Sequence, residues 1–176
     1  MDIYQPAEDS NFLALHVKKY AKGRVLDVGT GSGIQAKTAL KIAEKVIAVD
    51  INEDAIKYCK EKYPEIEFRV SDLFSNVIEQ FDLIIFNPPY LPMDEEDEKV
   101  FDPALFGGKN GWEIIERFLI DAKSYLKDNG RILLLISSLT NQTKVEEILT
   151  KENYNFKQID ELKMDFERLY IYEIGK

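Results

Sequence analysis

Phe81-Asp82-Leu83-Ile84-Ile85-Phe86-Asn87-Pro88-Pro89-Tyr90 joins an apolar run to an abrupt stop. The apolar part is rich in β-branched and aromatic residues, which is typical of a buried strand. Pro88 and Pro89 have no backbone N–H, so the sheet cannot continue beyond Asn87. The sequence therefore places Asn87 at the carboxyl end of a strand. Its side-chain amide, the Pro88 carbonyl and the Tyr90 ring together suit the capture of a flat group that carries an NH2.

Strands and helices are expected to alternate on both sides of this stretch. We predict a doubly wound, mostly parallel, seven-stranded α/β sheet of the Rossmann-like type, with helices on both faces. The last two strands have no helix between them, so they are expected to form an antiparallel hairpin. The whole chain, 1–176, is expected to be a single domain. The expected strands are 24–28, 45–50, 65–70, 81–87, 131–137, 156–163 and 168–174, and the expected helices are 10–20, 34–44, 52–63, about 114–126 and 140–151.

More local expectations concern where these elements start and stop. Asp9 or Ser10 is expected to cap the first helix, and Asn52 to cap the third. Asn129-Gly130 is expected to turn the chain into the fifth strand. The third strand is expected to lie at an edge of the sheet.

Composition and charge narrow the classes of function. The chain is 45% hydrophobic and 31% charged, as in soluble globular proteins, and has no membrane-length apolar run or signal-like N-terminus. A single cysteine, Cys59, and a single histidine, His16, disfavour a disulfide, a cysteine–histidine metal site and most histidine-based catalysis. We therefore expect a cytoplasmic enzyme without a metal of its own. The net charge of −9 argues against unaided binding to nucleic acid.

A glycine-rich loop follows the first expected strand. Its sequence is Gly29-Thr30-Gly31-Ser32-Gly33, and Ile34 stands where a dinucleotide-binding fingerprint requires its last glycine. Asp27 lies just upstream, where it would repel a diphosphate. An acid at this position suits a ligand with a positive amino group, such as the methionine part of S-adenosylmethionine.

Two further acids end the next two strands. Asp50 is placed to accept two ribose hydroxyls, and Asp72, followed by Leu73, is placed to meet an adenine. A lone glycine loop is weak support for a cofactor, and an aspartate at a strand end is often only a helix cap. Because Asp27, Asp50, Asp72 and Asn87 all fall at successive strand ends, they favour one ligand crevice at the carboxyl edge of the sheet.

These motifs resemble a known family. Asp27–Gly33 together with Asn87–Tyr90 is similar to class I S-adenosylmethionine-dependent methyltransferases that modify planar nitrogens. Within these, the chain resembles the HemK/PrmC group, which methylates the glutamine of the Gly-Gly-Gln motif in peptide-chain release factors. Three further stretches resemble the short archaeal and eukaryotic branch of this group. They are Tyr4-Gln5-Pro6-Ala7-Glu8-Asp9-Ser10, Phe106-Gly107-Gly108-Lys109-Asn110-Gly111 and Glu167-Arg168-Leu169.

The resemblance implies S-adenosylmethionine as cofactor, a release factor as substrate, and a set of site residues. It also implies a small zinc-binding activator protein as partner, which we expect on the edge strand at 66–70. Gln5 departs from the Glu that the family usually has, which puts any charge role there in doubt. The implied catalytic residues are Asn87, Pro88, Pro89 and Tyr90, and the implied cofactor-binding residues are Ser10, Asp27, Gly29, Thr30, Gly31, Gly33, Asp50, Ile51, Asp72, Leu73 and Asn87.

Two other functions stay open from the residues alone. The motif Asn87–Tyr90 fits the exocyclic amine of adenine or guanine as well as an amide, so a nucleic-acid amino methyltransferase is the main alternative. A methyltransferase-like binding module is the other, and the complete motif disfavours it. The acidic run Asp94-Glu95-Glu96-Asp97-Glu98 is interpreted either as a solvated loop or as a docking surface for a basic substrate domain.

Overall fold

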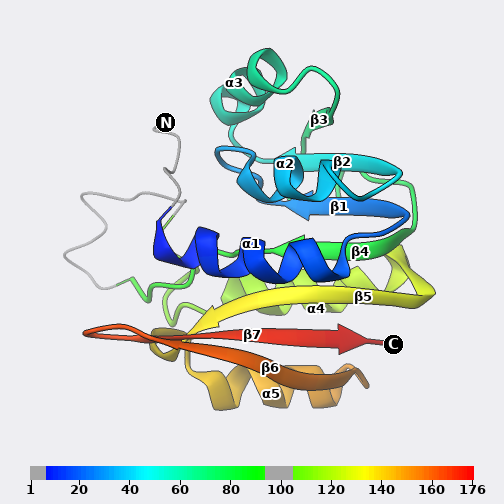
Figure 1. Ribbon diagram of the computed structural model, residues 1–176. Coiled ribbons are helices and arrows are strands. Elements are labelled where there is room, and N and C mark those ends of the chain that lie inside the picture. Colours follow the sequence, from blue (N-terminus) through cyan, green and yellow to red (C-terminus); the bar gives the residue numbers. More distant parts are fainter. Residues whose placement is uncertain (1–6, 94–104) are drawn as a thin grey trace.

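The computed structural model describes residues 7–93 and 105–176, which build a seven-stranded sheet (Figure 1). The strand order is β3-β2-β1-β4-β5-β7-β6, with β7 antiparallel to both of its neighbours and the other pairs parallel. This confirms the predicted mostly parallel sheet, its C-terminal hairpin and the edge position of the third strand. The strands are β1 (Arg24–Val28), β2 (Lys45–Asp50), β3 (Glu67–Val70), β4 (Phe81–Phe86), β5 (Leu126–Ser137), β6 (Asn155–Lys163) and β7 (Arg168–Gly175).

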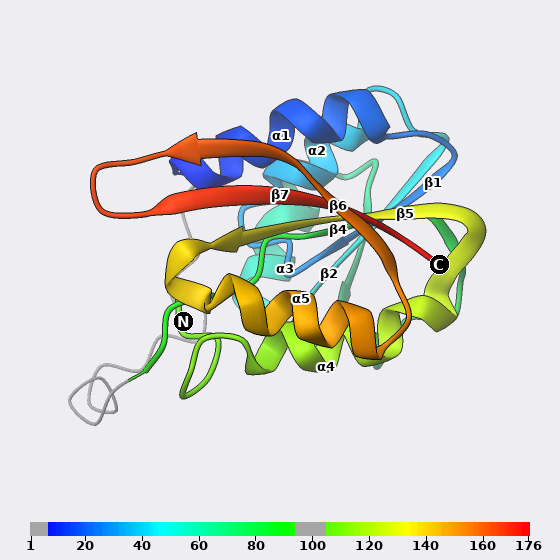
Figure 2. The same ribbon diagram turned by 90° about the horizontal axis from the view of Figure 1, so that it is seen from below.

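Helices cover both faces of the sheet, as expected for a doubly wound fold. Figure 2 shows α1 on one side of the strands and α4 with α5 on the other. The α2 and α3 helices share the hydrophobic core of α1. The helices are α1 (Glu8–Tyr20), α2 (Ile34–Leu40), α3 (Glu53–Lys62), α4 (Glu113–Tyr125) and α5 (Gln142–Lys151), and a short 3-10 helix, η2 (Ser138–Thr140), precedes α5.

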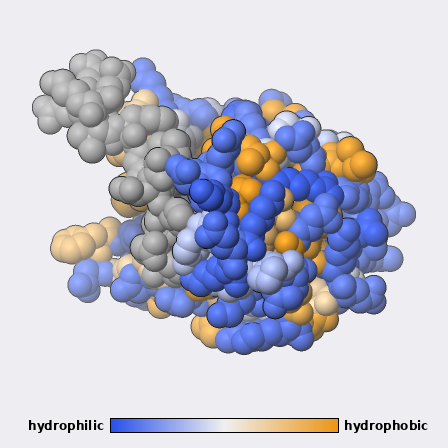
Figure 3. Space-filling model, turned by 90° about the horizontal axis from the view of Figure 1, so that it is seen from above, coloured by the Kyte–Doolittle hydropathy of each residue, from blue (hydrophilic) through white to orange (hydrophobic). Residues whose placement is uncertain are grey.

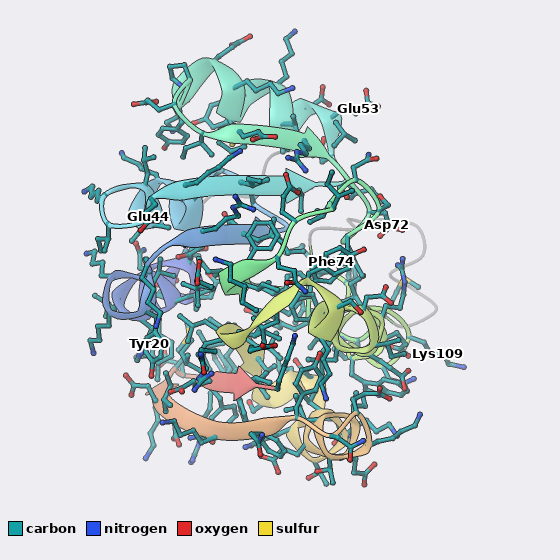
Figure 4. All side chains as sticks on the ribbon, turned by 90° about the vertical axis from the view of Figure 1, so that its right-hand side faces the viewer. Tyr20, Glu44, Glu53, Asp72, Phe74 and Lys109 are labelled. Atoms are coloured by element: carbon teal, nitrogen blue, oxygen red, sulfur yellow. The ribbon has the colours of Figure 1, made fainter. Side chains whose placement is uncertain are left out.

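The two faces hold separate hydrophobic cores because side chains alternate along each strand. In β4, Leu83 and Ile85 pack toward α1, α2 and α3, whereas Ile84 and Phe86 pack toward α4 and α5. Figure 4, an end-on view of the sheet, shows Tyr20 of α1 on the opposite side from Phe74. The uninterrupted apolar run in β4 is therefore explained by burial on both faces.

Phe118 of α4 is the centre of an aromatic cluster, and its truncation is expected to destabilise the fold. It is fully buried, with ring centroids 4.5 Å from Phe86 and 5.4 Å from Phe74. Phe118→Ala should lower the free energy of unfolding by about 3–5 kcal/mol, since it leaves a cavity. Urea denaturation measures this, with Ile120→Ala on the exposed side of the same helix as control. Equal losses for the two variants would contradict this packing.

Several expected boundaries were wrong for local reasons. The first helix begins at Glu8, with Ala7 as an N-cap that makes no side-chain hydrogen bond, so Asp9 and Ser10 lie inside the first turn. There an acid is favourable beside the helix dipole. The predicted cap at Asn52 is confirmed, because its side chain accepts a hydrogen bond from Asp54 N–H.

Further along the chain, the helix α2 ends at Leu40 rather than at Glu44, and β3 begins at Glu67 rather than at Glu65. The turn expected at Asn129-Gly130 is absent, because β5 already begins at Leu126. Leu126 pairs with Phe81 of β4, and the pairing register then shifts between Phe81 and Leu83. The α5 helix starts at Gln142 because η2 takes up residues 138–140.

Two sequence features fall outside the described ranges. These are the acidic run at 94–98 and residues 4–6 of the first resemblance stretch. In the described ranges, 7–93 and 105–176, no helix is long and apolar enough to cross a membrane.

Candidate functional site

A cavity of about 550 Å³ opens at the carboxyl ends of β1, β2, β3 and β4. The predicted site residues come together there with one exception, Gly33. This convergence follows from the parallel strands, whose carboxyl ends share one edge of the sheet. The predicted residues that line the cavity are Ser10, Asp27, Gly29, Thr30, Gly31, Asp50, Ile51, Asp72, Leu73, Asn87, Pro88, Pro89 and Tyr90.

Gly33 serves the packing of the glycine loop. Its φ of +80° favours glycine, and an added Cβ would stand 2.9 Å from Cε2 of Tyr63 and 3.1 Å from Sγ of Cys59. The missing side chain therefore lets the loop lie close against α3.

Asp27 is a buried acid at the floor of the cavity. It is 1% exposed, and its Oδ2 accepts hydrogen bonds from Thr30 Oγ1 (2.6 Å) and from Ala36 N–H (3.0 Å). Burial raises the pKa of Asp27 to about 7, against the opposing effect of these two hydrogen bonds. A positive charge in the cavity would favour the ionised carboxylate.

The raised pKa of Asp27 predicts a pH dependence of stability. Between the ordinary aspartate pKa of about 4 and the folded value of about 7, the folded state binds this proton more tightly than the unfolded state does. The free energy of unfolding should therefore fall as pH rises through this window, by at most about 1.4 kcal/mol per unit.

Urea denaturation of the wild type and of Asp27→Asn at several pH values from about 5 to 8 isolates the contribution of this carboxyl. We expect the unfolding free energy of the wild type, relative to that of Asp27→Asn, to fall as the pH rises to about 7 and then to level off. A difference that does not change with pH would contradict the burial of an ionisable group at this position.

Asp50 ends β2 and holds the glycine loop in place. Its Oδ2 accepts from Gly31 N–H (2.8 Å) and its Oδ1 from Asn52 N–H (2.9 Å). Burial raises its pKa above the usual range. Each carboxylate oxygen can accept a second hydrogen bond, so Asp50 can still receive two ligand hydroxyls. Ile51 beside it is 60% exposed and offers an apolar wall.

Asp72 and Leu73 form the far wall of the cavity, after β3. Asp72 is half-exposed and accepts a hydrogen bond from the Arg117 guanidinium at 2.8 Å. Leu73 adopts a left-handed φ of 49°, which is uncommon outside glycine and found at ligand sites. Figure 4 labels Asp72 on the side of the sheet that α4 covers.

Asn87 is oriented by a residue that the sequence did not single out for the site. Its Nδ2 donates to Asp9 Oδ2 at 2.9 Å, across 78 residues of chain. Its Oδ1 is buried and has no hydrogen-bond partner among the described residues. An acceptor without a partner in a cavity wall is suited to a ligand N–H.

A loop packs tightly over the two prolines. Leu91 N–H donates to the Leu105 carbonyl and Gly107 N–H donates to the Leu91 carbonyl, each at 3.0 Å. A Cβ on Gly107 would stand 2.5 Å from the Pro89 carbonyl oxygen, so glycine is required at this contact. Thr140 Oγ1 also donates to the Tyr90 carbonyl at 3.4 Å. The loop beyond β4 is thereby held from two sides.

Sequence reasoning missed other residues of the cavity wall. Asp9 and Glu167 lie within stretches that carry the family resemblance, which is the signal that could have identified them. Gln35 and Arg117 sit on helices at positions without a distinctive pattern. Gln35 Nε2 donates to the Ser10 carbonyl at 2.8 Å, and its buried Oε1 has no partner among the described residues.

The cavity is lined mainly by acidic side chains among its charged residues, and this charge limits the kind of ligand that it can bind. Among the described residues that line it, Arg117 is the basic one, and six are acidic: Asp9, Asp27, Asp50, Asp72, Glu113 and Glu167. A diphosphate would be repelled by this wall, whereas a ligand with an ammonium and a sulfonium would be attracted. The exposed Ile51 and the glycine loop also fit a nucleoside lying against backbone, so the residues fit S-adenosylmethionine.

Comparisons with known proteins consistently find methyltransferases. The model of the family described as "Methyltransferase small domain" matches residues 6–166. A Methanocaldococcus jannaschii protein that is provisionally named a protein N5-glutamine methyltransferase is 40% identical over 97% of this chain and 90% of its own length. A Koribacter versatilis protein named release factor glutamine methyltransferase is 39% identical over 79% of this chain.

One solved structure is similar over nearly the full length of both chains. It is the E. cuniculi Mtq2–Trm112 complex, described as responsible for methylation of the translation termination factor eRF1. The TM-score is 0.81 at 28% identity, covering 100% of this chain and 99% of that one. This chain spans only 54% of the Koribacter versatilis relative.

Proposed function

The chain belongs to the methyltransferase small-domain family, and on that premise we propose that it transfers a methyl group from S-adenosylmethionine to a glutamine side-chain amide. The proposed acceptor is the glutamine of the Gly-Gly-Gln motif in a peptide-chain release factor. The observation that carries this proposal is the buried Oδ1 of Asn87, which lies in the wall of an acidic cavity and has no hydrogen-bond partner among the residues that the structure describes. The names of the similar proteins support the same acceptor.

The cofactor is proposed to lie along the strand ends. Asp50 would accept the two ribose hydroxyls, and Asp72 with Leu73 would flank the adenine. Ser10, Asp27 and the loop 29–31 would surround the methionine part, where the carboxylate of Asp27 balances its ammonium. When bound, S-adenosylmethionine supplies an electrophilic methyl group on a positive sulfur, and the electron pair of the broken C–S bond stays on sulfur.

The protein's own contribution is alignment of the acceptor. An amide nitrogen is a poor nucleophile because its lone pair is delocalised. Asn87 Oδ1 and the Pro88 carbonyl would accept hydrogen bonds from the two N–H groups of the substrate amide. The Tyr90 ring would pack on the plane of that amide. The nitrogen lone pair forms the new N–C bond, and one amide proton leaves to water. Holding the nitrogen in line with the methyl group can supply several kcal/mol of the barrier reduction.

The competing acceptor is the exocyclic amine of a nucleic-acid base. Both acceptors present a planar NH2, so the Asn87 motif does not separate them. The net charge of −9 disfavours a nucleic acid. The test is to offer release factor, RNA and DNA together with S-adenosylmethionine labelled in its methyl group. Label in the release factor fraction supports the proposal, and label confined to nucleic acid contradicts it.

We also propose that a small zinc-binding activator protein pairs with the β3 edge. The similar E. cuniculi protein was solved as a two-protein complex. On this chain β3 is an edge strand, Val70 is 38% exposed, and Figure 3 shows apolar side chains among polar ones on this side of the molecule. An uncovered edge can add a strand from a partner. A monodisperse protein that is fully active when expressed alone would remove the need for such a partner.

A further inference from the structure

We propose that Asp9 is a positioning residue that fixes which half of the Asn87 side-chain amide faces the acceptor. The inference rests on the proposed function, because it concerns how Asn87 presents its oxygen. It arises from one hydrogen bond of the Asn87 side chain and from one buried atom of the same side chain, which has no partner in the described part of the chain. Asp9 itself is not proposed to touch the reacting nitrogen.

The chemistry of the contact decides the orientation of the amide. Asn87 has a donor NH2 at one end and an acceptor oxygen at the other. Asp9 Oδ2 lies 2.9 Å from Asn87 Nδ2. A carboxylate oxygen accepts hydrogen bonds, so the flipped amide would bring two acceptors together. The orientation with NH2 toward Asp9 is therefore the favourable one.

The consequence appears at the other end of the same amide. With Nδ2 held by Asp9, Asn87 Oδ1 is left buried, without a partner among the described residues. A buried acceptor that lacks a partner is unfavourable, so binding of an N–H group there would relieve it. Donation to a carboxylate also polarises the amide and makes its oxygen a stronger acceptor.

The carboxylate that performs this role is itself held in place. Asp9 is 5% exposed, in the first turn of α1, and its Oδ1 accepts from Ser10 N–H at 2.6 Å. The Ser10 carbonyl in turn accepts from Gln35 Nε2 on α2. The start of α1 is thereby tied to α2 on one side and to the end of β4 on the other.

Kinetics of two substitutions test the proposal. Asp9→Ala removes the acceptor and allows the Asn87 amide to flip. We expect kcat to fall roughly 10- to 100-fold, which is the worth of one hydrogen bond to a charged group, while the KM for substrate and the Kd for S-adenosylmethionine change little. Asp9→Asn keeps an oxygen acceptor and should recover a clear part of the lost kcat.

A matched control lies next to Asp9 on the same turn. Glu8→Ala removes an exposed carboxylate from the same helix and should leave kcat unchanged. An Asp9→Ala variant as active as the wild type would overturn the positioning role. An Asp9→Asn variant no better than Asp9→Ala would overturn it as well.

A spectroscopic measurement separates this inference from the proposed function. In protein with 15N-labelled asparagine, the Asn87 side-chain amide protons should exchange with water more slowly than those of exposed Asn129. This protection should be lost in Asp9→Ala and largely kept in Asp9→Asn. Exchange in the wild type as fast as at Asn129 would overturn the inference even if a variant failed to fold. Protected Asn87 protons in a protein that does not methylate release factor would contradict only the proposed function.

Discussion

Replacing Asn87 by alanine is expected to lower kcat for methyl transfer by roughly 10²–10³-fold, the usual cost of losing one preorganised polar group in an active site. The buried Oδ1 of this residue is the acceptor that would orient the substrate amide. The cavity walls that would hold the cofactor come mainly from other elements, so the Kd for S-adenosylmethionine should change only a few-fold.

Steady-state kinetics and calorimetric titration of the same Asn87→Ala preparation separate the two quantities. Asn155→Ala provides a matched control, because it removes an exposed asparagine amide from β6. Turnover at the wild-type rate in Asn87→Ala would refute the assigned role. A proportionate loss of cofactor affinity would instead make Asn87 mainly a binding residue.

Asp50→Ala is expected to have the opposite pattern and to weaken cofactor binding by about 100-fold or more. The carboxylate would accept ribose hydroxyls, and a hydrogen bond to a charged group is worth about 1.5–3 kcal/mol. It also holds the glycine loop through Gly31 N–H and Asn52 N–H, so its removal loosens the loop that the cofactor contacts.

Calorimetric titration with S-adenosylmethionine measures this loss directly. Asp54→Ala is the control, since it removes an exposed carboxylate from the first turn of α3. We expect the control to bind as the wild type does. An Asp50→Ala variant whose Kd stays within about threefold of the wild type, less than one such hydrogen bond is worth, would contradict the proposed ribose site.

The sheet and the strand-end residues could be predicted from sequence because two simple signals agree. Apolar runs such as 81–86 end at residues that cannot continue a sheet, and parallel strands bring their carboxyl ends to one edge. Asp27, Asp50, Asp72 and Asn87 therefore had to converge, as they do. The strand bounds of β1 and β2 were also as predicted, because both strands are short, apolar and sharply bounded.

The missed features depend on contacts between distant segments. Asp9 reads as a helix cap in sequence, yet its carboxylate reaches Asn87 on another element. For Gly33, the sequence did not show that the close approach of α3 also requires a glycine there. The start of β5 at Leu126 follows from pairing with Phe81, which overrides the turn propensity of Asn129-Gly130. Such tertiary contacts leave no local pattern.

Location of the transferred methyl group tests the central claim most directly. A release factor is incubated with the protein and S-adenosylmethionine that carries a deuterated methyl group, and its peptides are sequenced by tandem mass spectrometry. We predict one labelled methyl on the side-chain nitrogen of the glutamine in Gly-Gly-Gln, and none after incubation with Asn87→Ala. A methyl group on any other residue, or on added RNA or DNA alone, would contradict the account.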